Sequence, residues 1–276
     1  MNKKGLVKII MAISLLIAIL AMTLFGPVLS KYDVAKQNAA DRLLLPSKTH
    51  IMGTDRFGRD IFVRLLQGGR ITISSAVTAL ILAVCIGIIL GMIMGAYENK
   101  IIDIVLLRVM DVLLAFPFIV LAMLVVTFIG TGMKNLVLCI VIVYWIPFAR
   151  VTRKIVCTEK QSVLYEAELL LGKRPWKIIV QAILPKIIQI VLVQSTFELA
   201  SIILSLSALS FLGLGIKPPS PEWGSMLSDG RAHFLMYPHL IAGPGLAVVI
   251  LVFTINLLGE GLRDYFDPYQ KVELID

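Results

Sequence analysis

The chain has 276 residues, of which 58% are hydrophobic, and it carries a formal net charge of +8. Its mean hydropathy is +0.90, and its apolar residues form long uncharged runs, as in membrane proteins that cross the bilayer several times. The basic residues lie between these runs, which argues against a compact nucleic-acid-binding domain and favours contact with lipid headgroups.

Six uncharged runs are expected to cross the membrane, counting one short run and one interrupted run. They are residues 8–29, 71–97, 105–130, 135–151, 187–214 and 239–260. A helix needs about 20 apolar residues to cross a bilayer, and backbone groups in lipid must bond within their own segment. The first run exceeds the roughly 7–15 residues of a signal-peptide core, so we expect a retained span. The short fourth run should extend through Arg150.

Three polar segments, 31–70, 152–186 and 215–238, separate these runs. None is large enough for a catalytic fold, and the chain has no P-loop, so we expect neither an enzyme nor ATP hydrolysis by this chain. The histidines lack a ligand spacing, so no metal site is expected. A weak positive-inside bias puts the N-terminus inside the cell and segments 31–70 and 215–238 outside.

The second and third runs each carry a short pattern. Gly87, Gly91 and Gly95 are spaced four apart, which places them on one helix face where another helix can approach closely. In the third run, Arg108 and Asp111 can pair at i, i+3 ahead of a proline. This pair is interpreted either as a hinge or gate, or as an ion pair at the membrane interface.

Glu198 lies near the middle of the fifth run. An ionisable residue at that depth is a functional-site candidate, because its burial costs several kcal/mol unless it is paired or hydrated. It could contact a cationic group of a cargo, serve as the ion site of a secondary transporter, or pair with a neighbouring helix.

The segment 165–185 is polar and lies between two apolar runs. Residues 166–171 predict a short helix that Gly172 can terminate. Pro175 fits the first turn of a second helix, which we expect to lie along the membrane surface and to end at Pro185. The unit is either a connector or a docking surface for a soluble partner.

Four motifs, in this order, carry a resemblance to a known family. They are MGTDRFGRDIFVRLLQGGR (52–70), YEAELLLG with ILP (165–172 and 183–185), LSFLGLGIKPPSPEWGSMLSDGR (209–231) and NLLGEGLRDYFDP (256–268). The sequence resembles the inner-membrane permease subunit of binding-protein-dependent ABC importers, in the branch that imports dipeptides, oligopeptides and nickel. The second motif resembles that family's EAA loop, except that Glu168 stands where the pattern has a small residue.

The resemblance implies an all-α polytopic protein with six transmembrane helices, the type I ABC importer permease fold and a cytoplasmic coupling helix. Residues 1–70 would form an N-terminal transmembrane helix and an extracytoplasmic GTDxxGRD segment. Residues 71–276 would form a permease core of five transmembrane helices, with the EAA loop at 152–186.

By the same resemblance, the chain forms half of a translocation path for a small peptide, nickel or a metal chelate delivered by an extracytoplasmic binding protein. The implied partners are a second homologous permease, two ATP-binding subunits, that binding protein and membrane lipid, without nucleic acid. No cofactor is expected in this chain, since ATP and Mg would be held by the ATPases. The location would be a bacterial or archaeal inner or plasma membrane, with both termini cytoplasmic. The alternative is an ion-coupled secondary transporter using Glu198.

Three groups of site residues follow. Coupling to the ATPase is expected of Tyr165, Glu166, Ala167, Glu168, Leu171 and Gly172. A place in the path or gate is expected of Arg108, Asp111, Glu198, Ser210, Gly213 and Gly215. Contact with the binding protein is expected of Asp55, Arg59, Asp60, Pro219, Glu222 and Trp223.

Overall fold

The computed structural model describes residues 3–266, and within them the regular structure is helical. The long helices are α1 (Lys3–Leu29), α2 (Ile61–Ala96), α3 (Ile101–Ala115), α4 (Phe118–Ile129), α5 (Met133–Lys160), α8 (Leu184–Phe211) and α10 (His239–Phe266). The short helices are α6 (Val163–Leu170), α7 (Pro175–Ile178) and α9 (Trp223–Arg231), with a 3₁₀ turn at Ala39–Asp41. The predicted all-α class is confirmed.

Five helices are long and apolar enough to span a membrane, and the bent pair α3 and α4 is the sixth candidate. They coincide with the six runs expected from the sequence, and α5 extends beyond Arg150 to Lys160, as predicted. α2 begins at Ile61, so the expected division after residue 70 falls within this helix. Asp60 caps it by accepting a hydrogen bond from the Val63 amide at 2.9 Å.

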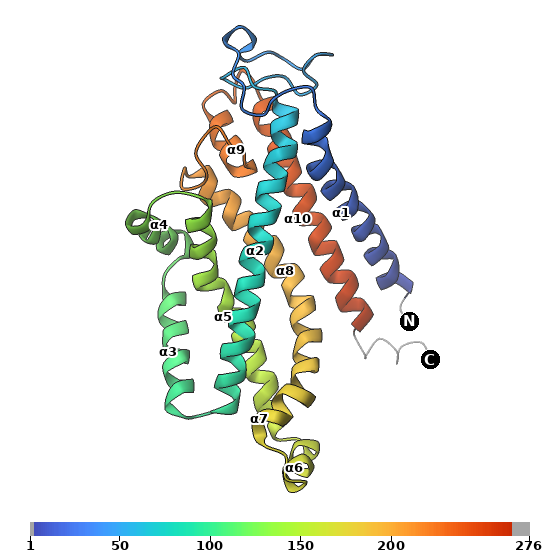
Figure 1. The fold of residues 1–276 in the computed structure, drawn as a ribbon, viewed down its shortest axis with the longest axis vertical. Helices are drawn as coiled ribbons and strands as arrows, with labels where there is room; N and C mark the ends of the chain where they lie inside the picture. Colours follow the sequence, from blue (N-terminus) through green and yellow to red (C-terminus); the bar gives the residue numbers. More distant parts are fainter. Residues whose placement is uncertain (1–2, 267–276) are drawn as a thin grey trace.

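The run 105–130 suggested one helix for the third span, but the structure has two helices there. α3 and α4 meet at an angle of 95°, and Figure 1 shows α4 lying crosswise to the bundle. Pro117 explains the break, because it lacks an N–H and disfavours helical backbone at the preceding residue. Phe116 accordingly has extended backbone angles, with φ −97° and ψ 137°.

The expected surface helix over 174–184 is also corrected. Residues Pro175–Phe211 form one continuous span, in which a π-helical turn at Ile179–Ile183 joins α7 to α8. In that turn the Leu184 amide donates to the carbonyl of Ile179. The wider turn accommodates Pro185, whose ring and missing N–H would disrupt a regular α-helix. Pro185 therefore does not end the helix.

α2 and α5 pack closely along the centre of the bundle. The three glycines spaced four apart make this approach possible, as predicted. A Cβ atom added at Gly87 would lie 2.5 Å from Cβ of Phe148, and one at Gly91 would lie 2.6 Å from the Ala149 carbonyl oxygen. Only a glycine fits such contacts without a shift of the backbone.

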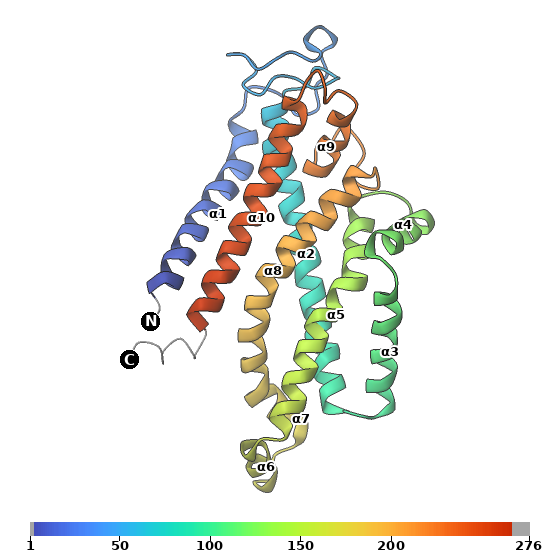
Figure 2. The ribbon, with the colours of Figure 1, turned by 180° about the vertical axis from the view of Figure 1, so that it is seen from behind.

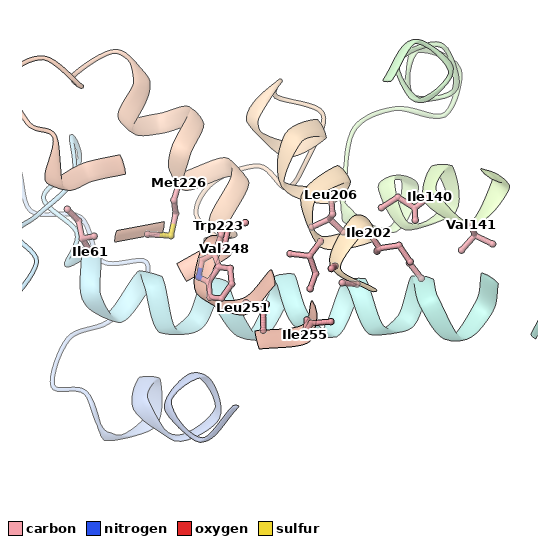
Figure 3. Close-up of a cluster of buried hydrophobic side chains, with 14 of the residues drawn as sticks. Ile61, Ile140, Val141, Ile202, Leu206, Trp223, Met226, Val248, Leu251 and Ile255 are labelled. Atoms are coloured by element: carbon pink, nitrogen blue, oxygen red, sulfur yellow. The ribbon is translucent and has the colours of Figure 1, made fainter. Parts of the chain in front are cut away.

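The largest hydrophobic cluster joins the middle of the bundle to one of its ends. Figure 3 shows its labelled members, which come from α2, α5, α8, α9 and α10: Ile61, Ile140, Val141, Ile202, Leu206, Trp223, Met226, Val248, Leu251 and Ile255. The short helix α9 is therefore fixed against the long helices by its own apolar side chains.

The two ends of the molecule carry different segments. Figures 1 and 2 show α6 projecting at one end, and the beginning of α1 and the end of α10 point toward that end but stop short of α6. Segment 30–60 and α9 lie at the opposite end. The relative placement of the polar segments thus matches the expectation. The end of the motif 256–268 and the expected location of the C-terminus lie outside the described residues.

Candidate functional site

The loop around α6 is closed by local hydrogen bonds at both ends. The Ser162 side chain accepts from the Tyr165 amide at 3.2 Å and caps the helix. At the other end, the Gly172 amide bonds to the Leu169 carbonyl at 2.9 Å and the Lys173 amide to the Glu168 carbonyl at 3.2 Å. This paired pattern needs a left-handed residue, and Gly172 has a φ of +79°. The predicted short helix with its terminal glycine is confirmed.

Tyr165 anchors this loop to the long helices. Its side chain is buried in a cluster with Phe148 and Val156 of α5 and with Ile178 and Ile183 of the following span. Burial raises the pKa of its phenol above the ordinary value, so the anchor is uncharged at neutral pH. Tyr165 thereby links α6 to both α5 and the span that begins at Pro175.

The outer surface of α6 is unusually apolar for a segment beyond the ends of the spans. Leu170 is 89% exposed and Leu171 is 79% exposed, and Glu166 and Ala167 are exposed beside them. An exposed apolar patch of this kind is typical of a surface that contacts another protein or the membrane. Four of the six expected coupling residues, Glu166, Ala167, Leu171 and Gly172, are thus accessible.

Glu168 differs from its neighbours. Its carboxylate forms an ion pair with Lys173 inside the same loop, and its side chain is more buried than that of Lys173. The acid that departs from the EAA pattern therefore has a partner within the chain, rather than standing free on the exposed surface.

At the opposite end, a cluster of ion pairs joins segment 53–60 to α9. Arg59 Nε donates to Asp55 Oδ2 at 2.7 Å, and Arg64 Nε lies 3.4 Å from the same oxygen. Arg56 Nη2 donates to Asp229 Oδ1 at 2.9 Å, and Arg59 Nη2 lies 3.7 Å from Asp229 Oδ2. Because Arg59 is only 1% exposed, this cluster is part of the structure of that end.

Glu222 and Trp223 connect the last loop to α2. The buried Glu222 carboxylate accepts from two amides in the first turn of α9 at 2.9 Å, and from Thr72 Oγ1 at 3.2 Å. Burial raises the pKa of this carboxyl above 4.5, although those hydrogen bonds act in the opposite direction. Trp223 Nε1 donates to the Leu65 carbonyl at 2.8 Å.

The six residues expected to contact a binding protein therefore differ in accessibility. The side chains of five, namely Asp55, Arg59, Asp60, Glu222 and Trp223, are mostly or fully enclosed by their own chain. Asp60, besides capping α2, pairs with His50 Nδ1 at 2.8 Å. Pro219 is exposed, and direct contact with a partner fits this residue best.

Three of the expected path residues lie together at the end of α8. Ser210 and Gly213 line a hollow of about 140 Å³ whose other walls include Arg64, Lys217 and Ser228. Gly215 lies directly beside Ser210. The hollow carries the cations Arg64 and Lys217, the acid Asp229 and several hydroxyl groups, so its lining is polar and holds charges of both signs.

The other path candidates are not gathered there. Arg108 Nη1 lies 3.8 Å from Asp111 Oδ2, as the i, i+3 spacing predicts, but Asp111 is closer to Arg150 of α5, at 3.3 Å. Glu198 is half-buried on α8, and within residues 3–266 it forms no ion pair with Arg108 or Arg150. These residues form separate sites.

The sequence reasoning missed the roles of Arg64, Thr72 and Asp229. Their partners are far away in the chain: Thr72 bonds to a residue 150 positions later, and Asp229 bonds to one 173 positions earlier. No local pattern could have indicated these pairs. The nearest signal was the two motifs 52–70 and 209–231, which contain both halves of the Arg56–Asp229 contact, whereas Thr72 lies two residues beyond the first motif.

The family described as "Binding-protein-dependent transport system inner membrane component" matches residues 87–272. The glutathione transport system permease protein GsiD of Pectobacterium atrosepticum is 37% identical over 92% of this chain and 84% of its own length. The dipeptide transport system permease protein DppC of Alkalihalophilus pseudofirmus is 36% identical over 98% of this chain and 87% of its own.

Among solved structures, an inward-facing conformation of the MetNI methionine ABC transporter is similar in fold. It superposes with a TM-score of 0.59 at 18% sequence identity, covering 74% of this chain and 96% of that one. The similarity at this identity concerns the fold alone.

Proposed function

The chain belongs to the family of binding-protein-dependent transport system inner membrane components, and from that premise we propose that it forms half of a translocation path for a small peptide. It is a permease component of an ABC importer, a multi-pass protein of the inner membrane and not an enzyme. Its fold is the type I importer permease fold. Membership of this family does not support the alternative of an ion-coupled secondary transporter.

ATPase and substrate-binding components are the partners that family membership implies. The finer assembly is our proposal: a second homologous permease, two ATP-binding subunits that hold ATP and Mg, and a binding protein on the other side of the membrane. α6 would then face the cytoplasm together with the beginning of α1. The observation that carries this proposal is the projecting α6 with its exposed Leu170 and Leu171.

The coupling follows from how α6 is attached. A partner that pushes on α6 acts on Tyr165, which packs against α5 and against the span that begins at Pro175. Because that span continues without a break to Phe211, its far end moves with its near end. The far end carries Ser210 and the hollow beside it, so closure of the ATPases would change the shape of the path at the opposite side of the membrane.

A peptide cargo is favoured over nickel by two observations. The similar proteins GsiD and DppC are named for glutathione and dipeptide transport, and both of those cargoes carry a terminal carboxylate. The hollow beside Ser210 is lined by the cations Arg64 and Lys217 and by the acid Asp229, and charges of both signs suit the carboxylate and the amine of a peptide.

The test is uptake in proteoliposomes that contain the complete importer. Uptake of a dipeptide should require ATP, and Glu166→Lys should prevent co-purification of the ATPases without preventing membrane insertion of this chain. Asp33→Lys is the matched control, because Asp33 is exposed at the opposite end of the molecule. Uptake that follows a proton gradient without ATP would overturn the proposal, as would normal docking and transport in Glu166→Lys.

Cargo class is tested on the same vesicles. Competition by an unlabelled dipeptide should exceed competition by its C-terminal amide and by Ni²⁺. Stronger inhibition by Ni²⁺ than by the dipeptide would identify the metal branch instead.

A further inference from the structure

A groove between three helices remains open on the side of the bundle. It has a volume of about 370 Å³ and is lined by side chains of α1, α2 and α10 together with Met52 and Trp223. The α1 and α10 residues in its wall include Leu15, Ala18, Met22, Gly243, Ala247 and Ile250. We call this the apolar groove, because Thr23 is the one residue with a side-chain hydroxyl in its lining.

A second hollow adjoins the groove at the end of the molecule opposite α6. This outer hollow has a volume of about 360 Å³, and its wall includes Ser30, Lys31 and Tyr32. Met22 and Leu66 line both spaces. The two hollows therefore form neighbouring parts of one surface, one apolar and one with polar groups.

The groove exists because the helices meet through small residues. Gly26 brings α1 into close contact with Leu66 of α2, which fixes the distance between these helices. Ala18 and Ala247 then leave space that longer side chains would fill. α1 is otherwise a lipid-exposed helix, with 11% of its most apolar window buried.

The length of this surface matches one leaflet of a bilayer. From Leu15 to Ser30 the α1 helix advances about 22 Å, at 1.5 Å per residue. Half of the hydrocarbon core is about 15 Å thick, and the headgroup region adds several more. The apolar groove therefore lies at the depth of acyl chains when the outer hollow lies at the depth of headgroups.

The charges of the outer hollow favour an anionic headgroup. Lys31 is exposed, and among the described residues it forms no ion pair. The acid in the hollow, Asp60, is already engaged by His50 and by the Val63 amide. Tyr32 also lines the outer hollow, and its hydroxyl donates to the Thr49 carbonyl at 2.7 Å. Tyrosines are enriched at the membrane interface. The charge that remains available is thus positive.

We propose that the apolar groove and the outer hollow together bind one phospholipid, with an acyl chain between α1, α2 and α10 and its phosphate at Lys31. An anionic headgroup such as phosphatidylglycerol is preferred over a zwitterionic one, because a basic residue near the surface contributes about 1 kcal/mol toward anionic lipid. The lipid fills the space between α1 and the rest of the bundle and so holds this helix in place.

The first experiment measures lipid retention by native mass spectrometry of the purified complete importer supplied with phosphatidylglycerol. Ala18→Leu fills the groove and should lower the retained fraction about tenfold. Ala21→Leu makes the same change on an exposed part of α1 that lines neither hollow, and should leave retention unchanged. Equal retention in all three proteins would overturn the proposal.

The second experiment tests the headgroup. Lys31→Gln should weaken phosphatidylglycerol retention about fivefold, equivalent to about 1 kcal/mol, and should abolish the preference over phosphatidylcholine. Lys36→Gln, at an exposed lysine outside the outer hollow, should do neither. An electron cryomicroscopy map of the importer in nanodiscs should show a forked, elongated density along α1. A helix of another subunit in that position would refute lipid as the occupant.

Discussion

Arg153 donates two hydrogen bonds to Asp103, from Nε to Oδ1 at 2.6 Å and from Nη2 to Oδ2 at 2.7 Å. The pair joins α5 to the first turn of α3, and Asp103 is only 1% exposed. α3 also packs its fully buried Met110 against Trp145 of α5 and Met94 of α2, and its other acid, Asp111, pairs with Arg150 on the surface. A hydrophobic cluster, a buried ion pair and an exposed one therefore hold α3 against the central helices.

Asp103→Asn should destabilise the protein markedly, because it leaves the Arg153 guanidinium without its charged partner in a poorly hydrated place. We expect a loss of about 3 kcal/mol, at the lower end of the range for breaking a buried pair, since Arg153 is partly exposed. The measurement is thermal unfolding of the purified protein. Asp111→Asn is the matched control on the same helix, and should cost less than about 1 kcal/mol. Equal losses in the two variants would contradict this view.

Gly91→Ala should loosen the packing of α2 on α5. The added methyl group would meet the Ala149 carbonyl oxygen and Thr152 Cβ, each at 2.6 Å, and the backbone must move to accept it. The expected cost is about 1–3 kcal/mol, typical of overpacking in a well-packed interior. Gly245→Ala is the control, because its new methyl group would lie 3.8 Å from Leu227. In a helix this change should be neutral or stabilising, so only Gly91→Ala should lower the free energy of unfolding in the same assay.

Glu168→Ala restores the small residue that the EAA pattern has at this position. Because Glu168 is paired with Lys173 inside the loop, we expect normal ATPase docking and a loss of stability below about 1 kcal/mol. Glu166→Ala, at an exposed position on the same helix, should reduce co-purification of the ATPases. If Glu168→Ala impairs docking as strongly as Glu166→Ala, the carboxylate of Glu168 contacts the partner after all.

Glu222 predicts a pH dependence of stability. Burial raises the pKa of its carboxyl above the ordinary value of 4.5, so the folded state binds this proton more tightly than the unfolded state. The contribution to stability is then fully present below pH 4.5 and is lost as the pH rises through the raised pKa. Glu222→Gln, which cannot ionise, should therefore gain stability relative to the wild type as the pH increases.

The free energies of unfolding of both proteins, measured from about pH 4 to pH 8, test this expectation, because this range begins near the ordinary pKa of a carboxyl and extends above it. A constant difference between Glu222→Gln and the wild type across the range would show that Glu222 titrates at the same pH in the folded and unfolded states.

The sequence alone determined the class of the molecule and the local structure of the loop around α6. Long uncharged runs must become helices in lipid, because no water is available to satisfy their backbone groups. Gly172 ends α6 with a positive φ that other residues adopt at a cost. Gly87 and Gly91 revealed a helix contact, since their spacing places them on one face. Each of these features depends on residues within a few turns of one another.

Only the tertiary structure decided which polar residues are accessible and how the spans bend. Arg59 and Glu222 looked like surface residues in polar segments, yet their partners come from distant parts of the chain and enclose them. Two prolines in these spans have opposite effects: the helix breaks at Pro117, but it continues through Pro185 after a π-helical turn. A proline breaks a helix where the chain can turn away, as between α3 and α4. The helix continues past a proline where packing keeps its direction, and here Ile179 and Ile183 pack against α5.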